Sequence, residues 1–246
     1  MTSFRFGKHP PKHDYRTLRL KKYLTAKLAA PPASYNVLPK VYKKLKISDP
    51  TALFPMDGND TLGDCTIAAL AHAETVYNGL ISKKKIWSKK NIIKLYFHLS
   101  GGVDSGLNML DVLNYWRKHP VDGDKILAFV SIDLKDRKHI QQAIQIFGGV
   151  YLGFQVQEDC IEDFNARRPW KPKPLTNDGH AVFAIGYDKK EVTVLTWGNT
   201  QKATWGWWNE CVDEAYAILP VQAKKSDFST GFDFDQLTTD LHEVAS

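Results

Sequence analysis

Two residues of this sequence, Cys65 and His180, have neighbours that suit nucleophilic chemistry. Cys65 lies in GNDTLGDCTIAAL, directly before a run of small and apolar residues with helical spacing. A thiol in the first turn of a helix meets the positive end of the helix dipole, which favours the thiolate that attacks carbonyls. Asp64 opposes the thiolate, so a positive partner is needed, and His180 in NDGHAVFAIGY is suited to that role. Taken singly, such a cysteine is more often a small buried apolar residue.

Periodicity predicts the elements that would position these two residues. Apolar residues at helical spacing follow Gly63, with Asp64 as the N-cap and Gly79 as the stop, so Cys65 falls in the first turn. Further helical patterns lie around 109–116, before Pro120, and over 140–147. The period then changes to two over 150–156, and β-type runs follow at 180–187 and 191–197. Helices followed by strands predict an α+β fold with a mostly antiparallel sheet.

The first 48 residues differ in charge from the rest of the chain. They hold 12 Lys or Arg and one Asp, a balance of +11, so the total of +6 leaves −5 for the remainder. Seven of the 12 prolines lie at or before position 55, which predicts an extended, irregular arm. Such an arm is either a patch for nucleic acid or another acidic partner, or a solvated strap over the body.

Several classes of protein are excluded by what the 246 residues lack. The apolar runs are too short to span a bilayer, and the N-terminus has no apolar signal region, so we expect a cytoplasmic protein without membrane contact. Three cysteines are too few for a disulfide scaffold, and Cys160 and Cys211 are expected to be packing residues. HExxH, CxxC and GxGxxG are absent, so no metal or cofactor is predicted.

Short motifs spread along the chain resemble those of the papain-like cysteine peptidases. They are Leu38-Pro39, the Cys65 helix, His180-Ala181-Val182, Ile185-Gly186-Tyr187, Thr196-Trp197-Gly198 and Trp205-Gly206. The resemblance runs from about Leu38 to Leu219, and the GDC stretch also resembles the bacteriocin-processing branch of these peptidases. It implies a papain-like α+β fold, in which a helical lobe and an antiparallel β-rich lobe enclose a cleft for an extended peptide or protein substrate.

The resemblance also implies roles for individual residues of a thiol peptidase or related amide hydrolase. Cys65 would form an acyl-enzyme thioester, with His180 as acid and base. Asn59, six residues before Cys65, takes the place of the oxyanion glutamine of the family, and Trp197 would shield the base. The family's CGSCW signature is replaced here by Gly63-Asp64-Cys65-Thr66.

The residue that orients the imidazole is the least defined member of the predicted site. Matching TWG to the SWG motif of the family places Leu195 there, whereas counting from His180 suggests Thr196. Asn199 shares the alternation parity of Trp197 and reaches back if the strand ends in a bend. Asn199 is therefore the predicted orienter.

Two rival functions and the domain boundaries complete the predictions. A papain-fold protein used only for binding would explain the divergent site residues. An ATP pyrophosphatase would instead use SGGVDS at 100–105 as a phosphate loop, although Gly, Ser and Asp are also ordinary turn residues. The predicted domains are an arm at 1–37, a catalytic domain at 38–222 and an acidic tail at 223–246. The tail carries Phe228, Phe232, Phe234 and Leu237 as possible anchors.

Overall fold

The computed structural model describes residues 4–48, 53–227 and 231–245. The helices are α1 (Leu38–Leu45), α2 (Cys65–Leu80), α3 (Lys89–Leu99), α4 (Met109–Lys118), α5 (Arg137–Phe147), α6 (Cys160–Asn165), α7 (Trp205–Cys211) and α8 (Phe234–Ala245), with short 3-10 turns η1 (Leu20–Tyr23) and η2 (Lys225–Asp227). The strands are β1 (Tyr35–Asn36), β2 (Ile126–Ser131), β3 (Val150–Gln157), β4 (Leu175–Tyr187), β5 (Glu191–Thr196), β6 (Asn199–Thr204) and β7 (Val212–Pro220).

The strands form one sheet in the order β2-β7-β3-β4-β5-β6, with β1 added alongside β4. Every pair of neighbouring strands in this sheet is antiparallel, which confirms the predicted α+β class. The segregation of helices before strands is less strict than predicted, because β2 lies between α4 and α5. Trp205, Trp207 and Trp208 belong to α7, a helix that the periodicity did not predict.

The sheet is buried on both faces, so the chain has two hydrophobic cores. On β3, Leu152 and Phe154 belong to the core that includes α5 and α7. Tyr151, which points the other way, belongs to the core that includes α2 and α4. The period-two pattern of β3 therefore places alternate side chains in two different hydrophobic cores, rather than alternately in a core and in solvent.

Helix α2 is central to the helical lobe and packs against β4. All of its residues from Cys65 to Gly79 are buried, so the helix is apolar or internally bonded on every side. Gly79 lies where α1 crosses, and a Cβ there would be 2.6 Å from Cγ1 of Val41. The predicted helix and its start are confirmed, although the Asp64 side chain makes no capping hydrogen bond.

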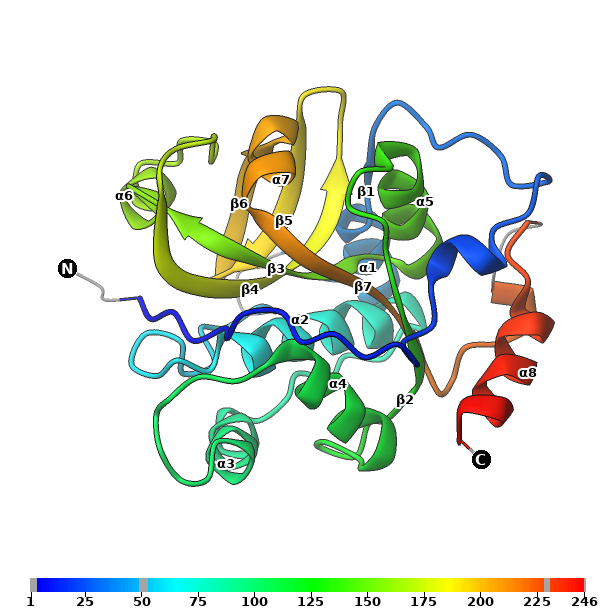
Figure 1. Cartoon of the computed structure of the whole chain (residues 1–246), viewed down its shortest axis with the longest axis horizontal. Coiled ribbons are helices and arrows are strands. Elements are labelled where there is room, and N and C mark those ends of the chain that lie inside the picture. The colour runs from blue at the N-terminus through cyan, green and yellow to red at the C-terminus, as the bar shows by residue number, and fades with distance from the viewer. Residues whose placement is uncertain (1–3, 49–52, 228–230, 246) are drawn as a thin grey trace.

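The N-terminal arm runs along the seam between the two lobes, with the sheet on one side and α2 and α4 on the other (Figure 1). Further along, Leu20 and Tyr23 are buried, and Tyr23 donates a hydrogen bond of 2.6 Å to Asp240 of α8. Phe232 and Leu237 of the acidic tail are buried in the same core, whereas Phe228 lies outside the described residues. Arm and tail are thus docked on the body and on each other.

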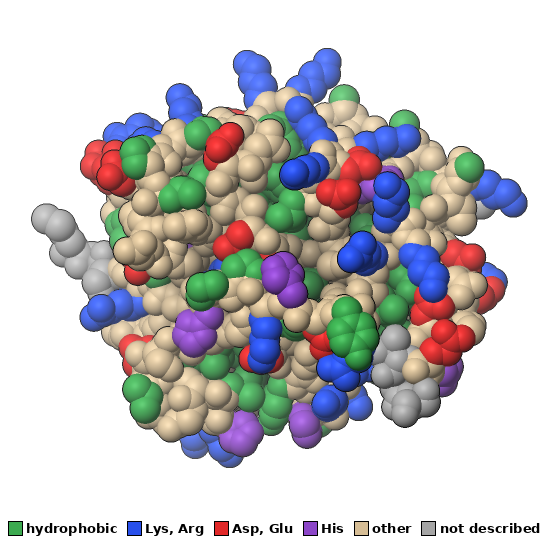
Figure 2. Space-filling view, viewed as in Figure 1, with side chains coloured by type: hydrophobic (Ala, Val, Ile, Leu, Met, Phe, Trp, Pro, Cys, Tyr) green, Lys and Arg blue, Asp and Glu red, His purple; other side chains and the backbone are tan. Residues whose placement is uncertain are grey.

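Ion pairs join cations of the arm to acidic residues of the chain. Lys8 pairs with Asp213 and Glu214, and Lys22 pairs with Asp240. The space-filling view shows Lys and Arg interspersed with Asp and Glu over the face that the arm crosses (Figure 2). In the part of the chain that the structure describes, no helix is both long and apolar enough to cross a membrane.

Candidate active site

Cys65 is the first residue of α2, as predicted, and it is 1% exposed. The loop that leads to it is fixed from outside, because Gly63 N donates to Asp104 Oδ1 at 2.9 Å. The backbone of Ala181, the residue after His180, and that of Gly7 of the arm both act to lower the pKa of the thiol, against the larger effect of burial. The fold therefore brings the Cys65 thiol beside the segment that carries His180.

His180 lies in β4, is fully buried and is enclosed by aromatic rings. Trp197 stacks on its imidazole with ring centroids 4.6 Å apart. Phe154 of β3 and Phe6 of the arm each meet the imidazole edge-on at 5.6 Å. Trp197 thus lies where the sequence predicted a shield for the base.

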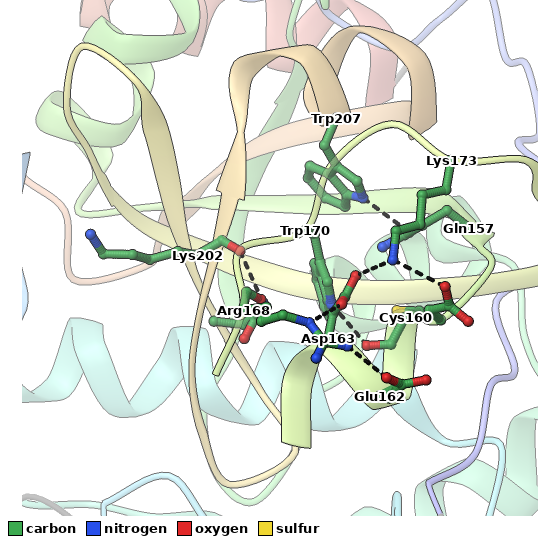
Figure 3. A network of polar contacts seen from close by, with 11 residues as sticks. Gln157, Cys160, Glu162, Asp163, Arg168, Trp170, Lys173, Lys202 and Trp207 are labelled. Atoms are coloured by element: carbon green, nitrogen blue, oxygen red, sulfur yellow. Dashed lines mark hydrogen bonds and ion pairs between the residues drawn. The ribbon is translucent and has the colours of Figure 1, made fainter. Parts of the chain in front are cut away.

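The aromatic layer behind His180 is held by polar contacts around α6. Trp170 meets Trp197 edge-on at 6.0 Å, and Trp170 Nε1 donates to the carbonyl of Cys160 at 2.9 Å. Figure 3 shows the network nearby, in which Asp163 accepts from Arg168 at 2.8 Å and from Lys173 at 2.7 Å. These contacts fix the wall on which the His180 ring rests.

Thr196, not Asn199, is the side chain that contacts the imidazole. Thr196 Oγ1 lies 2.8 Å from His180 Nε2, whereas the Asn199 side chain accepts a hydrogen bond from the backbone N of Thr200. Trp197 and Gly198 form a two-residue turn with φ of 48° and 73°, so Thr196 pairs with Asn199 across a tight hairpin. Asn199 therefore lies on β6, one strand further from His180 than β5, and the predicted orienter is corrected.

Asn59 lies in the loop before α2 and is 2% exposed. It lines a small cavity together with Cys65, Thr196 and Trp197. Its Nδ2 donates to Leu62 O at 3.1 Å and to Arg5 O, a peptide carbonyl of the arm, at 3.0 Å. The amide predicted to stabilise an oxyanion is therefore already bound to a peptide carbonyl.

Burial sets the protonation state of the three titratable residues at the site. It raises the pKa of the Cys65 thiol to about 12 and lowers the pKa of His180 to about 3. Burial, with the charge of Asp57 added, raises the pKa of Asp64 to about 8, so below that pH Asp64 lacks the negative charge that the sequence suggested. With the arm bound over the site, a state here called arm-covered, cysteine and histidine are thus both neutral near pH 7.

Residues 4–9 of the arm, here called the cleft segment, bind along the seam through their backbone. Gly7 N and Lys8 N both approach Gly179 O, at 3.1 and 2.9 Å. Leu107 N donates to Gly7 O at 2.8 Å, and His9 N donates to Leu107 O at 2.9 Å. The cleft segment is thus an extended peptide bound directly over Cys65 and His180.

Gly7 is a position of close backbone approach. A Cβ at Gly7 would lie 1.9 Å from the carbonyl oxygen of Gly63, and a Cβ at Gly106 would lie 2.3 Å from that of Gly7. The segment lies this close to the nucleophile loop only because position 7 has no side chain.

The SGGVDS stretch at 100–105 closes a turn between two helices. Gly101 and Gly102 have φ of 71° and 86°, and Asp104 accepts from both Gly63 N and the Tyr96 hydroxyl. A phosphate loop of the ATP pyrophosphatase type would follow a strand, but the KLYFHL before this stretch belongs to α3. The ATP hypothesis therefore lacks its structural setting, and Asp104 supports the loop before Cys65.

Among the described residues, no group of three or more His, Cys, Asp or Glu could hold a metal ion. Cys160 and Cys211 are free and buried in the β-rich lobe. His72 lines the same small cavity as Cys65 but its Nε2 contacts the carbonyl of Pro55 at 2.9 Å.

Solved structures with this fold are papain-like cysteine proteases. Xylellain, a cysteine protease from Xylella fastidiosa, has a TM-score of 0.67 at 18% identity, covering 90% of this chain and 98% of its own. Procathepsin B from Trypanosoma congolense has a TM-score of 0.63 at 14% identity, covering 89% and 87%. A Carica candamarcensis cysteine protease has a TM-score of 0.54 at 14% identity, covering 78% and 100%. No family model and no curated protein sequence matches the chain.

The chain therefore has the papain-like α+β fold, as the motif resemblance implied. Identities of this size define the fold alone, so the chemistry must be argued from the residues of this chain.

Sequence reasoning missed four residues at or near the site and set a fifth aside. Phe6 and Lys8 belong to the arm, which the sequence placed as a strap without a link to the cleft. Asp213 and Glu214 are adjacent acids within CVDEAYAIL, an otherwise apolar stretch, and this contrast was the available signal. Thr196 was considered as the orienter and was set aside in favour of Asn199.

Proposed function

We propose that this protein is a cysteine peptidase, or a related amide hydrolase, that uses Cys65 and His180. The observation that carries the proposal is the cleft segment itself. An extended peptide lies over Cys65 and is held by backbone hydrogen bonds to Gly179 and Leu107, so the cleft has the shape and the donors to bind a polypeptide.

In the proposed reaction, the Cys65 thiolate attacks a peptide carbonyl carbon while His180 carries the proton. The negative charge that develops on the oxygen is stabilised by Cys65 N–H and Asn59 Nδ2. His180 gives its proton to the leaving amine, and the C–N bond breaks to leave a thioester. Water then attacks the thioester with His180 as base, releasing the acid and regenerating the thiol.

Thr196 is the residue proposed to orient His180. Its hydroxyl contacts Nε2, while Nδ1 is buried without a hydrogen-bond partner among the described residues. With Nε2 fixed by Thr196, Nδ1 is the nitrogen left to exchange a proton with the thiol and the substrate.

The arm-covered state is proposed to be inactive. The cleft segment occupies the place of a substrate and excludes water, and the resulting burial opposes the thiolate–imidazolium pair. Displacing the segment would hydrate both groups, lower the pKa of the thiol and raise that of His180. Activity would therefore depend on how often the arm leaves.

The test uses the full chain with Gly7→Val and Lys8→Ala, here called the open-arm variant. Valine at position 7 would collide with Gly63 O, so this variant should hydrolyse a fluorogenic peptide library faster than wild type. Adding Cys65→Ser or His180→Ala should abolish hydrolysis, with near-wild-type circular dichroism as the check on folding. Unchanged hydrolysis in the Cys65→Ser form would show that the proposed mechanism is wrong.

The binding-only alternative is decided by the reactivity of the thiol. In the open-arm variant, Cys65 should react with iodoacetamide at pH 6 much faster than glutathione does, and His180→Ala should remove the advantage. A thiol no faster than glutathione would favour a papain-fold protein that binds peptides without cleaving them.

A further inference from the structure

Lys8 is a buried cation held by two acidic residues. Its side chain is 1% exposed, and its Nζ lies 2.8 Å from Asp213 Oδ2 and 3.3 Å from Glu214 Oε1. Nζ also donates to the carbonyl of His9 at 3.1 Å. A lysine seldom becomes so buried without such partners, so the surroundings of Lys8 are built for a positive charge.

The space that receives Lys8 exists because β3 carries a glycine there. A Cβ at Gly153 would lie 2.0 Å from Lys8 Cε and 2.6 Å from Met109 Sδ. Gly153 pairs across the sheet with Glu214, one of the two acids that contact Nζ. Met109, Gly153, Asp213 and Glu214 thus define a slot for a long side chain, here called the Lys8 pocket.

The pocket retains unused acceptor capacity while Lys8 is bound. Asp213 Oδ1 is buried and has no hydrogen-bond partner among the described residues. Glu214 Oε2 accepts from the Tyr216 hydroxyl at 2.9 Å, which fixes its carboxyl group. Burial raises the pKa of both acids, and the charge of Lys8 offsets part of that rise, so a cation in the pocket favours their ionised forms.

The Lys8 pocket adjoins the reacting centre. Lys8 follows Gly7, where a Cβ would lie 1.9 Å from the carbonyl oxygen of Gly63, two residues before Cys65, and a Cβ at Gly179, the residue before His180, would lie 2.3 Å from Lys8 O. A side chain in this pocket therefore belongs to a peptide whose backbone passes the thiol within about two residues of it.

We propose that the Lys8 pocket, vacated by the arm, selects a lysine or arginine side chain of the substrate. The inference rests on the proposed peptidase function. Without Lys8, two carboxylates lie close together in a narrow slot without a cation. The positive charge of a basic substrate side chain then takes the place of the Lys8 charge. An arginine, with five donors, would also reach the free oxygen of Asp213.

The first experiment maps the preference of the full-length open-arm variant. A peptide–coumarin library is scanned at each of the three positions before the cleaved bond with Lys, Arg, norleucine, Gln and Glu. Norleucine has the length of lysine without the charge, so it isolates the ion pair. At one position, kcat/KM for Lys or Arg should exceed that for norleucine at least tenfold.

The matched variant carries Asp213→Asn and Glu214→Gln in the same open-arm background, so no unpaired buried lysine is left behind. The basic preference should disappear, while hydrolysis of the norleucine peptides continues. Hydrolysis with no basic preference at any scanned position, or a preference that survives the two substitutions, would overturn the pocket assignment.

A binding measurement decides the pocket even if no peptide is cleaved. A fluorescein-labelled peptide FRFGKH, the sequence of the cleft segment, is titrated with the open-arm variant by fluorescence anisotropy. It should bind at least tenfold tighter than the same peptide with norleucine in place of lysine, and the two acid substitutions should remove the difference. Equal affinities would overturn the pocket, whereas a clear difference without any hydrolysis would overturn only the peptidase function.

Discussion

Two stretches of the same basic arm meet the body in different ways. The cleft segment, residues 4–9, places Lys8 in an ion pair with Glu214 in which the side chains are 1% and 5% exposed. A few residues later, Lys12 pairs with Asp111 at the surface, with side chains 58% and 57% exposed. Both pairs neutralise charge. Separating the buried pair while its acids stay buried costs much more free energy than separating the exposed pair, so only the buried pair can hold a segment in place.

The comparison shows that net charge alone did not indicate which part of the arm contacts the site. The balance of +11 is spread over the whole N-terminal stretch, whereas the site is contacted by a few residues of the cleft segment, of which Lys8 supplies a buried charge and Gly7 a close backbone approach. Gly7 allows backbone to lie on backbone, and Lys8 supplies the buried charge.

The largest effect is expected when the buried pair is broken. Lys8→Ala leaves Asp213 and Glu214 unpaired as long as the cleft segment stays bound, so the segment should leave more often and expose Cys65. The rate of Cys65 alkylation, followed by mass spectrometry of the intact chain, should rise about 10- to 100-fold at pH 7. No rise would mean that Lys8 does not hold the arm.

The second-largest effect is expected at the imidazole of His180, which the arm covers. In the open-arm variant, Thr196→Val removes the hydroxyl from His180 Nε2 at nearly constant volume. We expect kcat to fall about 10- to 100-fold with KM little changed, because the base is misoriented rather than the substrate lost. Thr196→Ser, which keeps the hydroxyl, should retain most of the activity; equal losses in both variants would argue against an orienting role.

The pH dependence of stability distinguishes the covered histidine from an exposed one. Burial lowers the pKa of His180 to about 3 in the folded chain, below its ordinary value of 6.5. The unfolded chain therefore binds a proton that the folded chain does not, and stability is lost as the pH falls from about 6.5 towards 3. His180 alone contributes a slope of up to about 1.4 kcal/mol per pH unit in this window.

Urea unfolding at a series of pH values measures this slope. His180→Phe should flatten the dependence between pH 6 and pH 4, whereas His13→Gln, on the exposed part of the arm, should leave it unchanged. An unaltered slope in His180→Phe would contradict the burial of a neutral imidazole.

The smallest effect is expected at the exposed pair. Lys12→Ala should change the free energy of unfolding by no more than about 0.5 kcal/mol, because both side chains are largely solvated and screened by salt. Alkylation of Cys65 should stay within twofold of wild type. A rise as large as that in Lys8→Ala would show that the arm is held along its whole length.

Much of the fold was predictable because it follows from local patterns. The start of α2 at Cys65, the helices near 109–116 and 140–147, and the antiparallel strands after residue 150 were all expected from periodicity and capping signals. The strand β2 was missed because its sequence, ILAFVS, has no long alternation of apolar and polar residues. The helix α7 was missed because its tryptophans are compatible with a strand as well as with a helix.

The residue that contacts the imidazole of His180 was mispredicted because the alternation of a strand no longer holds where the strand ends. The ladder between β4 and β5 ends at the pair of Phe183 and Leu195, so His180 and Thr196 both lie beyond it. There the chain turns sharply at Trp197, and Thr196 reaches the imidazole although it does not share the alternation parity of Trp197.

The sequence by itself determined that a cysteine and a histidine are the central residues of the candidate site and which elements carry them. Cys65 opens a helix and His180 lies in a strand because capping and periodicity are local properties of the chain. Only the tertiary structure decided what faces them, since the contacts of Gly7 with Gly179 and of Lys8 with Asp213 join residues more than 170 positions apart. Such contacts depend on how closely two backbones can approach and on how much charge burial can tolerate, and no local pattern encodes either quantity.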